Sequence, residues 1–236
     1  MERVDTGIGG LDNIIEGGLP AGKAYLLSGE PGTGKTLFTL QYLMHGAQKG
    51  ENGIYVSIDE KPEHVISDAE NMGWDIKKYL DSGLIQILDV SAYFSNARMG
   101  KKEELAVDQV VENLAEHAKS VQVKRLVIDP IAPLIFSHEG RQEIAEYMRT
   151  LIFSIEDSLN CTSLLTSHVP VGTQQFSQYG VEEFLVSGVI VLRIVKSEKR
   201  YLRSLFVRKL RGTQTDLTEY SFEITRGRGL ILRQPI

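Results

Sequence analysis

Eight consecutive residues have the types and spacing of a phosphate-binding loop. They read Gly29-Glu30-Pro31-Gly32-Thr33-Gly34-Lys35-Thr36. The glycines allow positive φ angles and a close approach of the backbone to phosphate, so that successive N–H groups point at the anion. Lys35 can bridge the β- and γ-phosphates, and the Thr36 hydroxyl can ligate Mg²⁺. The segment therefore predicts a nucleotide-binding site with Mg²⁺ as a cofactor.

A second candidate for the metal lies almost a hundred residues further on. Leu126-Val127-Ile128-Asp129 is an apolar strand that ends in a carboxylate. A carboxylate at such a position can hold Mg²⁺, usually through water. Many buried strands end in Asp, but a chain with a phosphate loop needs such a partner. We therefore expect Asp129 to share the metal with Thr36.

Hydrolysis also requires a group that orients and deprotonates the attacking water. Asp59-Glu60 ends the strand-like segment 55–58. Parallel strands deliver their carboxyl ends to one edge of a sheet, which would place Glu60 near the phosphates. The alternative is a solvated acidic pair at the start of the helix that begins at Lys61. Position alone does not decide between the two.

The elements that must position these residues alternate between strand and helix. Strand patterns cover 23–28, 53–58, 84–90, 125–129 and 161–166, and helical patterns cover 35–48, 61–71, 107–118 and 144–159. Segments 188–195, 201–210 and 220–224 are strand-like and joined by short turns. The pattern predicts an α/β fold with a mainly parallel sheet flanked by helices and a C-terminal antiparallel extension. No linker interrupts it, so we expect one domain over residues 1–236.

Composition excludes several classes of protein. The 236 residues are 42% hydrophobic and 24% charged, which is ordinary for a globular protein and excludes disordered, collagen-like and disulfide-scaffold chains. A net charge of −5 argues mildly against binding nucleic acid mainly through phosphates. The single cysteine, Cys161, favours a reducing compartment. No segment approaches the roughly 18 apolar residues of a membrane span, and no signal sequence is evident, so we expect a cytoplasmic protein with no membrane contact.

Several longer segments, in order, resemble the KaiC-type ATPase domain of the RecA/RadA superfamily. These are Thr6–Asp12, Gly17–Gly22, Ser57–Pro62, Tyr179–Phe184 and Lys209–Thr213, and the similarity covers nearly the whole chain. The resemblance implies a RecA-like P-loop core that binds ATP. It also implies that Glu60 is the catalytic base, with Asp59 as its neighbour.

The resemblance further implies a ring, usually a hexamer, with ATP at the subunit interfaces. Lys209 and Arg211 match the residues that reach into the neighbour's site, and the motif adds Leu210 and Thr213 to the cofactor-binding residues. An Arg donated across an interface stabilises charge on the transferring phosphoryl group and is worth about 10³–10⁵ in rate in related enzymes. Without the resemblance, these charges would simply end an edge strand in solvent.

One departure from the clock members of that family limits what can be carried over. Their phosphorylated domain has a Ser/Thr pair where this chain has Val181-Glu182-Glu183, and they have two such domains in tandem. Autophosphorylation and a circadian role are therefore not expected. Thr166-Ser167-His168 ends the strand where the superfamily senses the γ-phosphate, and His168 is either such a sensor or an ordinary loop histidine.

The main hypothesis is a Mg²⁺-dependent ATPase, and two others stay open. One is a nucleotide-gated module whose slow hydrolysis times the binding of an unidentified protein partner. The other is a recombinase-like DNA-binding ATPase. Two loops could contact single-stranded DNA. Loop 91–102 contains Arg98, Lys101 and Lys102. Loop 169–179 contains aromatic and amide side chains but no Lys or Arg. Thr6-Gly7 begins the core almost at once, which disfavours the recombinase.

Overall fold

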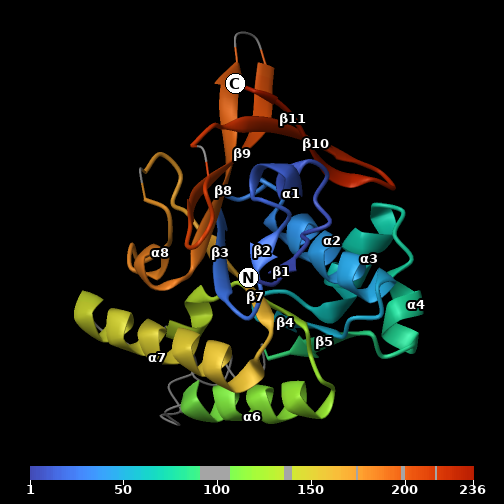
Figure 1. The fold of residues 1–236 in the computed structure, drawn as a ribbon, viewed down its shortest axis with the longest axis vertical. Coiled ribbons are helices and arrows are strands. Elements are labelled where there is room, and N and C mark those ends of the chain that lie inside the picture. The colour runs from blue at the N-terminus through green and yellow to red at the C-terminus, as the bar shows by residue number, and fades with distance from the viewer. Residues whose placement is uncertain (91–106, 136–139, 174, 198–199, 216) are drawn as a thin grey trace.

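The computed structural model describes residues 1–90, 107–135, 140–173, 175–197, 200–215 and 217–236 (Figure 1). Within these ranges, nine strands form one sheet in the order β11-β10-β9-β8-β3-β7-β6-β4-β5. Strands β3 to β8 run parallel to one another, whereas β9, β10 and β11 are each antiparallel to the strands beside them. The predicted α/β fold with a C-terminal antiparallel extension is confirmed.

The bounds of the strands agree with the predicted ranges to within two residues, and β11 was not predicted. They are β3 (Ala24–Gly29), β4 (Gly53–Ser57), β5 (Ile85–Asp89), β6 (Arg125–Asp129), β7 (Thr162–His168), β8 (Gly188–Ser197), β9 (Arg200–Leu210), β10 (Tyr220–Thr225) and β11 (Gly229–Pro235). A two-stranded sheet, β1 (Arg3–Val4) with β2 (Leu19–Pro20), lies outside the main sheet.

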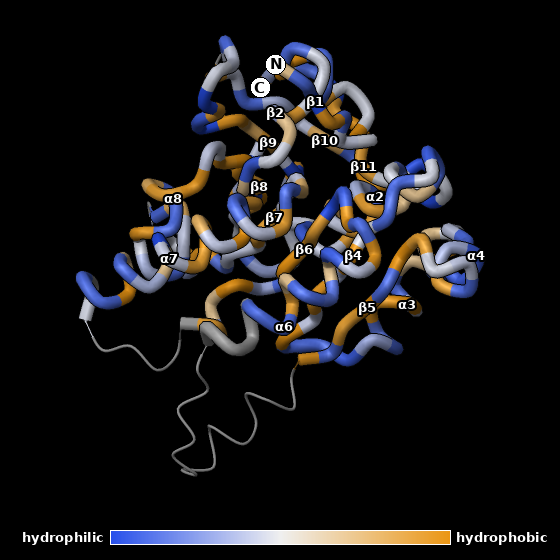
Figure 2. Tube along the Cα trace, turned by 60° about the horizontal axis from the view of Figure 1, so that its bottom comes forward, coloured by the Kyte–Doolittle hydropathy of each residue, from blue (hydrophilic) through white to orange (hydrophobic). Residues whose placement is uncertain are grey.

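Helices cover both faces of the sheet (Figure 1). One face carries α2 (Lys35–Gln48), α3 (Pro62–Asn71) and α4 (Ile76–Asp81), and the other carries α6 (Val107–Ser120) and α7 (Arg141–Leu159). Three short helices, α1 (Leu11–Ile14), η1 (Ala132–Ile135) and α8 (Glu182–Leu185), lie in the connections. Figure 2 shows hydrophobic residues along the central strands, where the two core layers meet the sheet. No helix in the described part of the chain has the length and apolar character that a membrane span requires.

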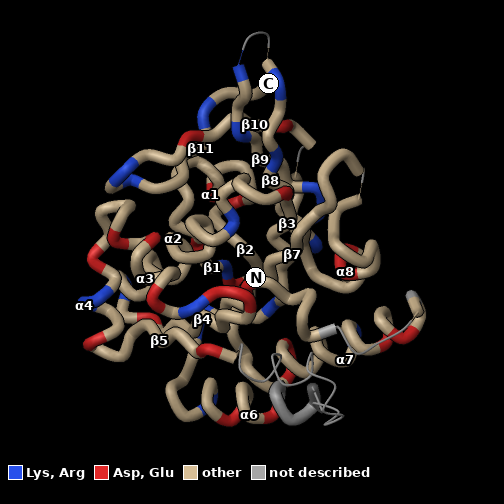
Figure 3. Tube along the Cα trace, turned by 180° about the vertical axis from the view of Figure 1, so that it is seen from behind, with Lys and Arg blue, Asp and Glu red and all other residues tan. Residues whose placement is uncertain are grey.

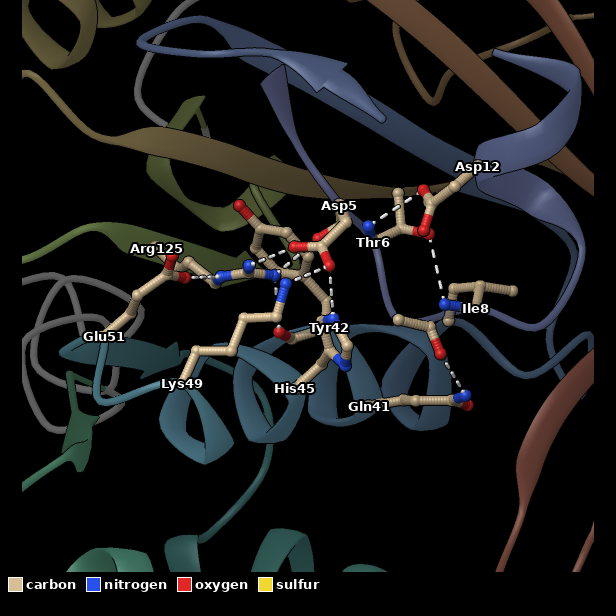
Figure 4. Close-up of polar contacts among 11 residues, drawn as sticks. Asp5, Thr6, Ile8, Asp12, Gln41, Tyr42, His45, Lys49, Glu51 and Arg125 are labelled. Atoms are coloured by element: carbon tan, nitrogen blue, oxygen red, sulfur yellow. Dashed lines mark hydrogen bonds and ion pairs between the residues drawn. The ribbon is translucent and has the colours of Figure 1, made fainter. Parts of the chain in front are cut away.

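A polar cluster joins the N-terminal segment to α2 and β6 (Figure 4). Arg125, at the start of β6, is only 1% exposed. Its guanidinium donates to a carboxylate oxygen of Asp5 at 3.1 Å and to one of Glu51 at 2.6 Å. The other oxygen of Asp5 pairs with Lys49 and lies 2.7 Å from Nε2 of His45. Asp5 therefore holds the chain leading into α1 against the C-terminal end of α2.

Replacing Asp5 should cost far more stability than its partly exposed position suggests. We expect Asp5→Ala to lower the free energy of unfolding by about 3 kcal/mol, because it removes one carboxylate from a buried guanidinium. Urea unfolding checks this, with Glu16→Ala as the control. Glu16 pairs with Arg3 at the surface, so its loss should cost less than about 1 kcal/mol. Equal losses in the two variants would contradict the assignment.

The same contribution should depend on pH in a defined direction. Partial burial opposes ionisation, but hydrogen bonds from Lys49, His45 and Arg125 outweigh it and lower the pKa of Asp5 below its usual value. The contribution is then complete above the unfolded-state pKa of about 4 and is lost as the pH falls through the folded-state pKa. Wild type and Asp5→Ala should therefore converge in stability under acid conditions.

Candidate nucleotide site

The phosphate loop, residues 29–36, connects β3 to α2. Gly32 and Gly34 have φ angles of 79° and 105°, a backbone region that L side chains rarely adopt. A Cβ on Gly34 would also lie 2.9 Å from Cδ1 of Ile224. Because α2 begins within the loop, at Lys35, the unpaired N–H groups of its first turn are available to an anion there. The backbone thus has the form that phosphate binding requires.

Lys35 is buried with its ammonium inside this loop. Its Nζ donates to the carbonyl oxygens of Gly29 at 2.8 Å and Glu30 at 3.1 Å. Burial lowers the pKa of Lys35 to about 8, while the negative charge of Asp129 opposes the shift. A phosphate would supply the anionic partner that these neutral carbonyls do not.

We expect Lys35→Ala to weaken ATP binding itself, because it removes the only cation of the phosphate loop. The loss should reach about 2–3 kcal/mol, or 30- to 150-fold in Kd, the range for removing a charge-assisted contact. Titration with a fluorescent ATP analogue measures it, with Lys61→Ala, an exposed lysine on a neighbouring segment, as the control. Unchanged affinity in Lys35→Ala would count against the loop as the phosphate site.

Asp129 lies beside the first turn of α2. One carboxylate oxygen accepts from Thr36 Oγ1 at 3.2 Å and from the Tyr55 hydroxyl at 2.5 Å, and the other accepts from Thr166 Oγ1. Burial, followed by the charge of Asp129, raises the pKa of Tyr55 well above its ordinary value, so this hydroxyl stays a donor. Sequence reasoning named Thr166 only as part of the γ-phosphate sensor segment and missed Tyr55, and both side chains hold the carboxylate in place.

The oxygen ligands beside the phosphate loop fit Mg²⁺. The hydroxyl of Thr36 and the carboxylate of Asp129 are hard oxygen ligands within hydrogen-bond distance of one another. The described residues contain no group of three or more His, Cys, Asp and Glu side chains that could hold a metal by themselves. Two protein oxygens are enough for Mg²⁺, which takes one or two protein ligands and completes its shell with water and substrate phosphates.

Glu60 reaches the same edge of the sheet. Strand β4 pairs with β6 so that Ser57 is opposite Asp129, and the Ser57 hydroxyl donates to the Glu60 carbonyl at 2.5 Å. Burial raises the pKa of Glu60, with further contributions from the charges of Asp68 and Asp129. Helix α3 has Lys61 at its N-cap and no side-chain cap there. Among the described residues, the Glu60 carboxylate has no hydrogen-bond donor, which leaves it available to a water.

His168 ends β7, directly opposite Gly29 in the parallel register. Its Nδ1 is buried without a hydrogen-bond partner in the described part of the molecule. Burial and then the charge of Lys35 lower the pKa of His168, and Asp129 and Asp59 partly oppose this. The imidazole therefore lies at the same end of the parallel strands as the phosphate loop.

The predicted interface residues lie at the opposite end of the strands, level with the start of β3. Strand β9 runs antiparallel to β8, and Leu205 is level with Leu192, which is in turn level with Gly29. A bulge in β9 takes up one residue, so Arg211 is level with Ala24 at the start of β3, five residues from Gly29, or roughly 17 Å at about 3.3 Å per residue. Lys209, Leu210 and Thr213 accompany it. The structure thus brings Lys35, Thr36, Asp129 and Glu60 together and separates this second group from them.

The C-terminal strands add two residues that the motifs did not indicate. Arg203 on β9 donates from Nε to the carbonyl of Gly32 at 3.3 Å. Ile224 on β10 packs against Gly34, as described above. Both contacts depend on how β9 and β10 pair with the main sheet, so no local sequence signal points to them.

Of the two loops considered for DNA, one lies outside the described residues and the other packs against β9. Loop 91–102, with Arg98, Lys101 and Lys102, and residue Gln174 lie outside the described residues. In the other loop, Phe176 packs edge-on against Phe206, with ring centroids 6.4 Å apart, and beneath Arg208. A cavity of about 520 Å³ is lined both by this loop and by Gly29 and Glu30 at the start of the phosphate loop. Phe176 is thus a packing residue in this arrangement.

Comparisons with known proteins agree with one another. The family model described as the KaiC ATPase matches residues 4–235. A UPF0273 protein of Pyrococcus furiosus is 35% identical over 98% of this chain and 94% of its own length. The circadian clock oscillator protein KaiC of Synechococcus elongatus is 32% identical over 95% of this chain and 43% of its own length. The crystal structure of a KaiC-like protein from Pyrococcus horikoshii is 33% identical, covers 99% of both chains and has a TM-score of 0.84.

Proposed function

Because the chain belongs to the KaiC family of ATPase domains, we propose that it is a Mg²⁺-dependent ATPase that acts as a homo-oligomeric ring, expected to be a hexamer. ATP would lie between adjacent subunits. The observation that carries this proposal is the separation of the site residues. Lys35, Asp129 and Glu60 lie at the C-terminal ends of the parallel strands, whereas Arg211 lies roughly 17 Å away at the opposite ends. Arg211 could therefore act on a γ-phosphate only from a neighbouring subunit, whereas Arg203 of the same subunit already contacts the phosphate loop at the Gly32 carbonyl.

Each residue has a role that follows from its chemistry. The loop N–H groups and Lys35 bind the phosphates, and Thr36 with Asp129 would hold Mg²⁺, which neutralises charge on the phosphate oxygens when bound. The carboxylate of Glu60 accepts a proton from the attacking water, which its raised pKa favours. Lys209 and Arg211 of the neighbouring subunit stabilise the charge that develops on the transferred phosphoryl group.

A subunit-mixing experiment tests the proposal. Glu60→Gln and Arg211→Ala should each hydrolyse ATP poorly alone. When subunits exchange, an Arg211→Ala subunit supplies an intact Glu60 and its Glu60→Gln neighbour supplies an intact Arg211. With equal amounts and random exchange, about a quarter of the interfaces regain both groups, so activity should recover to about a quarter of wild type. An Arg211 that acted only within its own chain could give no recovery.

The result is interpretable only if mixed rings form. Differently labelled subunits that co-elute in one oligomer establish this. Absence of recovery in proven mixed rings would overturn the trans assignment of Arg211. It would leave nucleotide binding by the phosphate loop unaffected.

A further inference from the structure

The segment from Phe176 to Glu183 is tied to both strands that lead into the nucleotide site. The hydroxyl of Ser28, directly before the phosphate loop, donates to the carbonyl of Phe176. The hydroxyl of Ser167, directly before His168, accepts from the backbone N–H of Gln178 at 3.0 Å. A shift at either strand end would therefore displace this segment through these hydrogen bonds.

Glu182 is the most unusual residue of the segment. It is 0% exposed, and among the described residues its carboxylate has no cationic partner. It accepts instead from the Ser167 hydroxyl at 3.3 Å and from the backbone N–H groups of Tyr179 at 3.3 Å and Val181 at 3.2 Å. Burying a carboxylate without a cation is costly, and three donors make it tolerable. The carboxylate fastens the first turn of α8 to the end of β7.

The other side of α8 holds the interface cations. Nζ of Lys209 donates to the carbonyls of Glu183 at 3.0 Å and Phe184 at 3.4 Å, and the Arg211 guanidinium donates to the Phe184 carbonyl at 3.3 Å. Figure 3 shows the acidic residues of α8 close to the basic strands β8 and β9. These carbonyls belong to the same four-residue helix that begins with Glu182.

We propose that Glu182 is a positioning residue that sets Lys209 and Arg211 for the neighbour's site, according to the state of its own subunit's strand β7. The inference rests on the proposed function, since it assumes that Arg211 acts on the neighbouring subunit. A continuous set of contacts runs from Ser167, beside His168, through the Glu182 carboxylate and the α8 carbonyls to the two cations. A change at one nucleotide site would reach the next site through this set.

The first test is Glu182→Gln. An amide keeps the size of the side chain but turns an N–H₂ group toward donors that need an acceptor, so α8 should shift. We expect kcat to fall about 10- to 100-fold, the cost of misplacing a catalytic group by about 1 Å. The Kd for ATP should stay within about twofold, because the phosphate loop is untouched. Glu143→Gln, an exposed acid on α7, is the control and should change neither.

Subunit mixing then shows which site Glu182 serves. Glu182→Gln mixed with Glu60→Gln should recover activity, as Arg211→Ala does with the same partner. Glu182→Gln mixed with Arg211→Ala should give no recovery, because both subunits then lack a well-placed cation. The reverse pattern would mean that Glu182 serves its own nucleotide site, and would overturn the inference. A variant that merely unfolds could produce neither pattern.

Two further outcomes have defined meanings. If Glu182→Gln fails to assemble, Ser167→Ala is used in its place, because it removes one donor to the same carboxylate. Ser167→Ala should show the same pattern of recovery in subunit mixing, with a smaller loss of kcat. If Glu60→Gln and Arg211→Ala fail to complement in proven mixed rings, the proposed function fails and this inference falls with it. If they complement and Glu182→Gln behaves as wild type, only the role of Glu182 is overturned.

Discussion

Glu60→Gln should bind ATP as wild type does and hydrolyse it about 10²- to 10⁴-fold more slowly. A positioned general base typically contributes that factor, and glutamine has the shape of glutamate but cannot accept the proton. Phosphate release at saturating ATP measures the loss, and a nucleotide titration shows that binding survives. The matched control is Glu63→Gln, an exposed acid three residues further on, which should keep the wild-type rate.

The pH dependence of the wild-type enzyme offers an independent check of Glu60. Burial and the nearby charges of Asp68 and Asp129 raise its pKa, so the carboxylate is protonated over a wider acid range than an exposed glutamate. The rate should fall as the pH falls through this raised pKa, because a protonated carboxyl cannot act as a base. The residual activity of Glu60→Gln should lack this acid limb. A near-wild-type rate in that variant would remove Glu60 from the mechanism.

The phosphate loop and Asp129 could be predicted because their signals are local. The glycines, Lys35 and Thr36 lie within one short segment whose backbone conformation follows from residue type. The placement of Glu60 needed one further rule, that parallel strands bring their carboxyl ends to one edge. The confirmed fold supports that rule here, because β3, β4, β6 and β7 are parallel members of one sheet.

Contacts between distant segments could not be predicted in this way. Arg203 and Ile224 reach the phosphate loop only because β9 folds back beside β8 and β10 beside β9, and strand register is not visible in a single sequence. The lead-in segment shows the same limit. Gly9 donates to the carbonyl of Leu230 at 3.1 Å and accepts from Leu232 at 2.8 Å, so the two ends of the chain meet. The family resemblance identified residues 6–12 as a motif but did not indicate that they pair with β11.

Glu182 illustrates a third kind of limit. In the sequence it is one of two adjacent acids in a segment shared with the family, and an acidic pair is most often solvated. Its complete burial depends on Ser167, fifteen residues earlier on another element. Residue type alone favours a surface position for a glutamate, and the tertiary contacts override that preference here. Disagreement between residue type and burial is expected at functional segments more than in the rest of the hydrophobic core.

Arg211→Ala should show the largest loss of all, about 10³- to 10⁵-fold in the rate of hydrolysis, with assembly and ATP affinity retained. The reason is that charge on the transferred phosphoryl group would lose the cation donated by the neighbour. Arg211→Lys should recover part of the rate, since it keeps the charge but not the planar fork of the guanidinium. Arg233→Ala is the control, because this exposed arginine pairs with Glu223 on the adjacent strand and is remote from the predicted interface motif.

The position of Arg211 also makes the wild-type enzyme depend on its own concentration. If each site is completed only by the neighbour's Arg211, the rate per subunit should fall when the protein is diluted below the concentration at which rings dissociate. Arg211→Ala should show no such fall, because its residual rate owes nothing to the neighbour's arginine. Phosphate release over a dilution series, with the oligomeric state measured in parallel, compares the two proteins. A wild-type rate that stays constant while the rings dissociate would show that one subunit hydrolyses ATP alone, and would rule out the interface role.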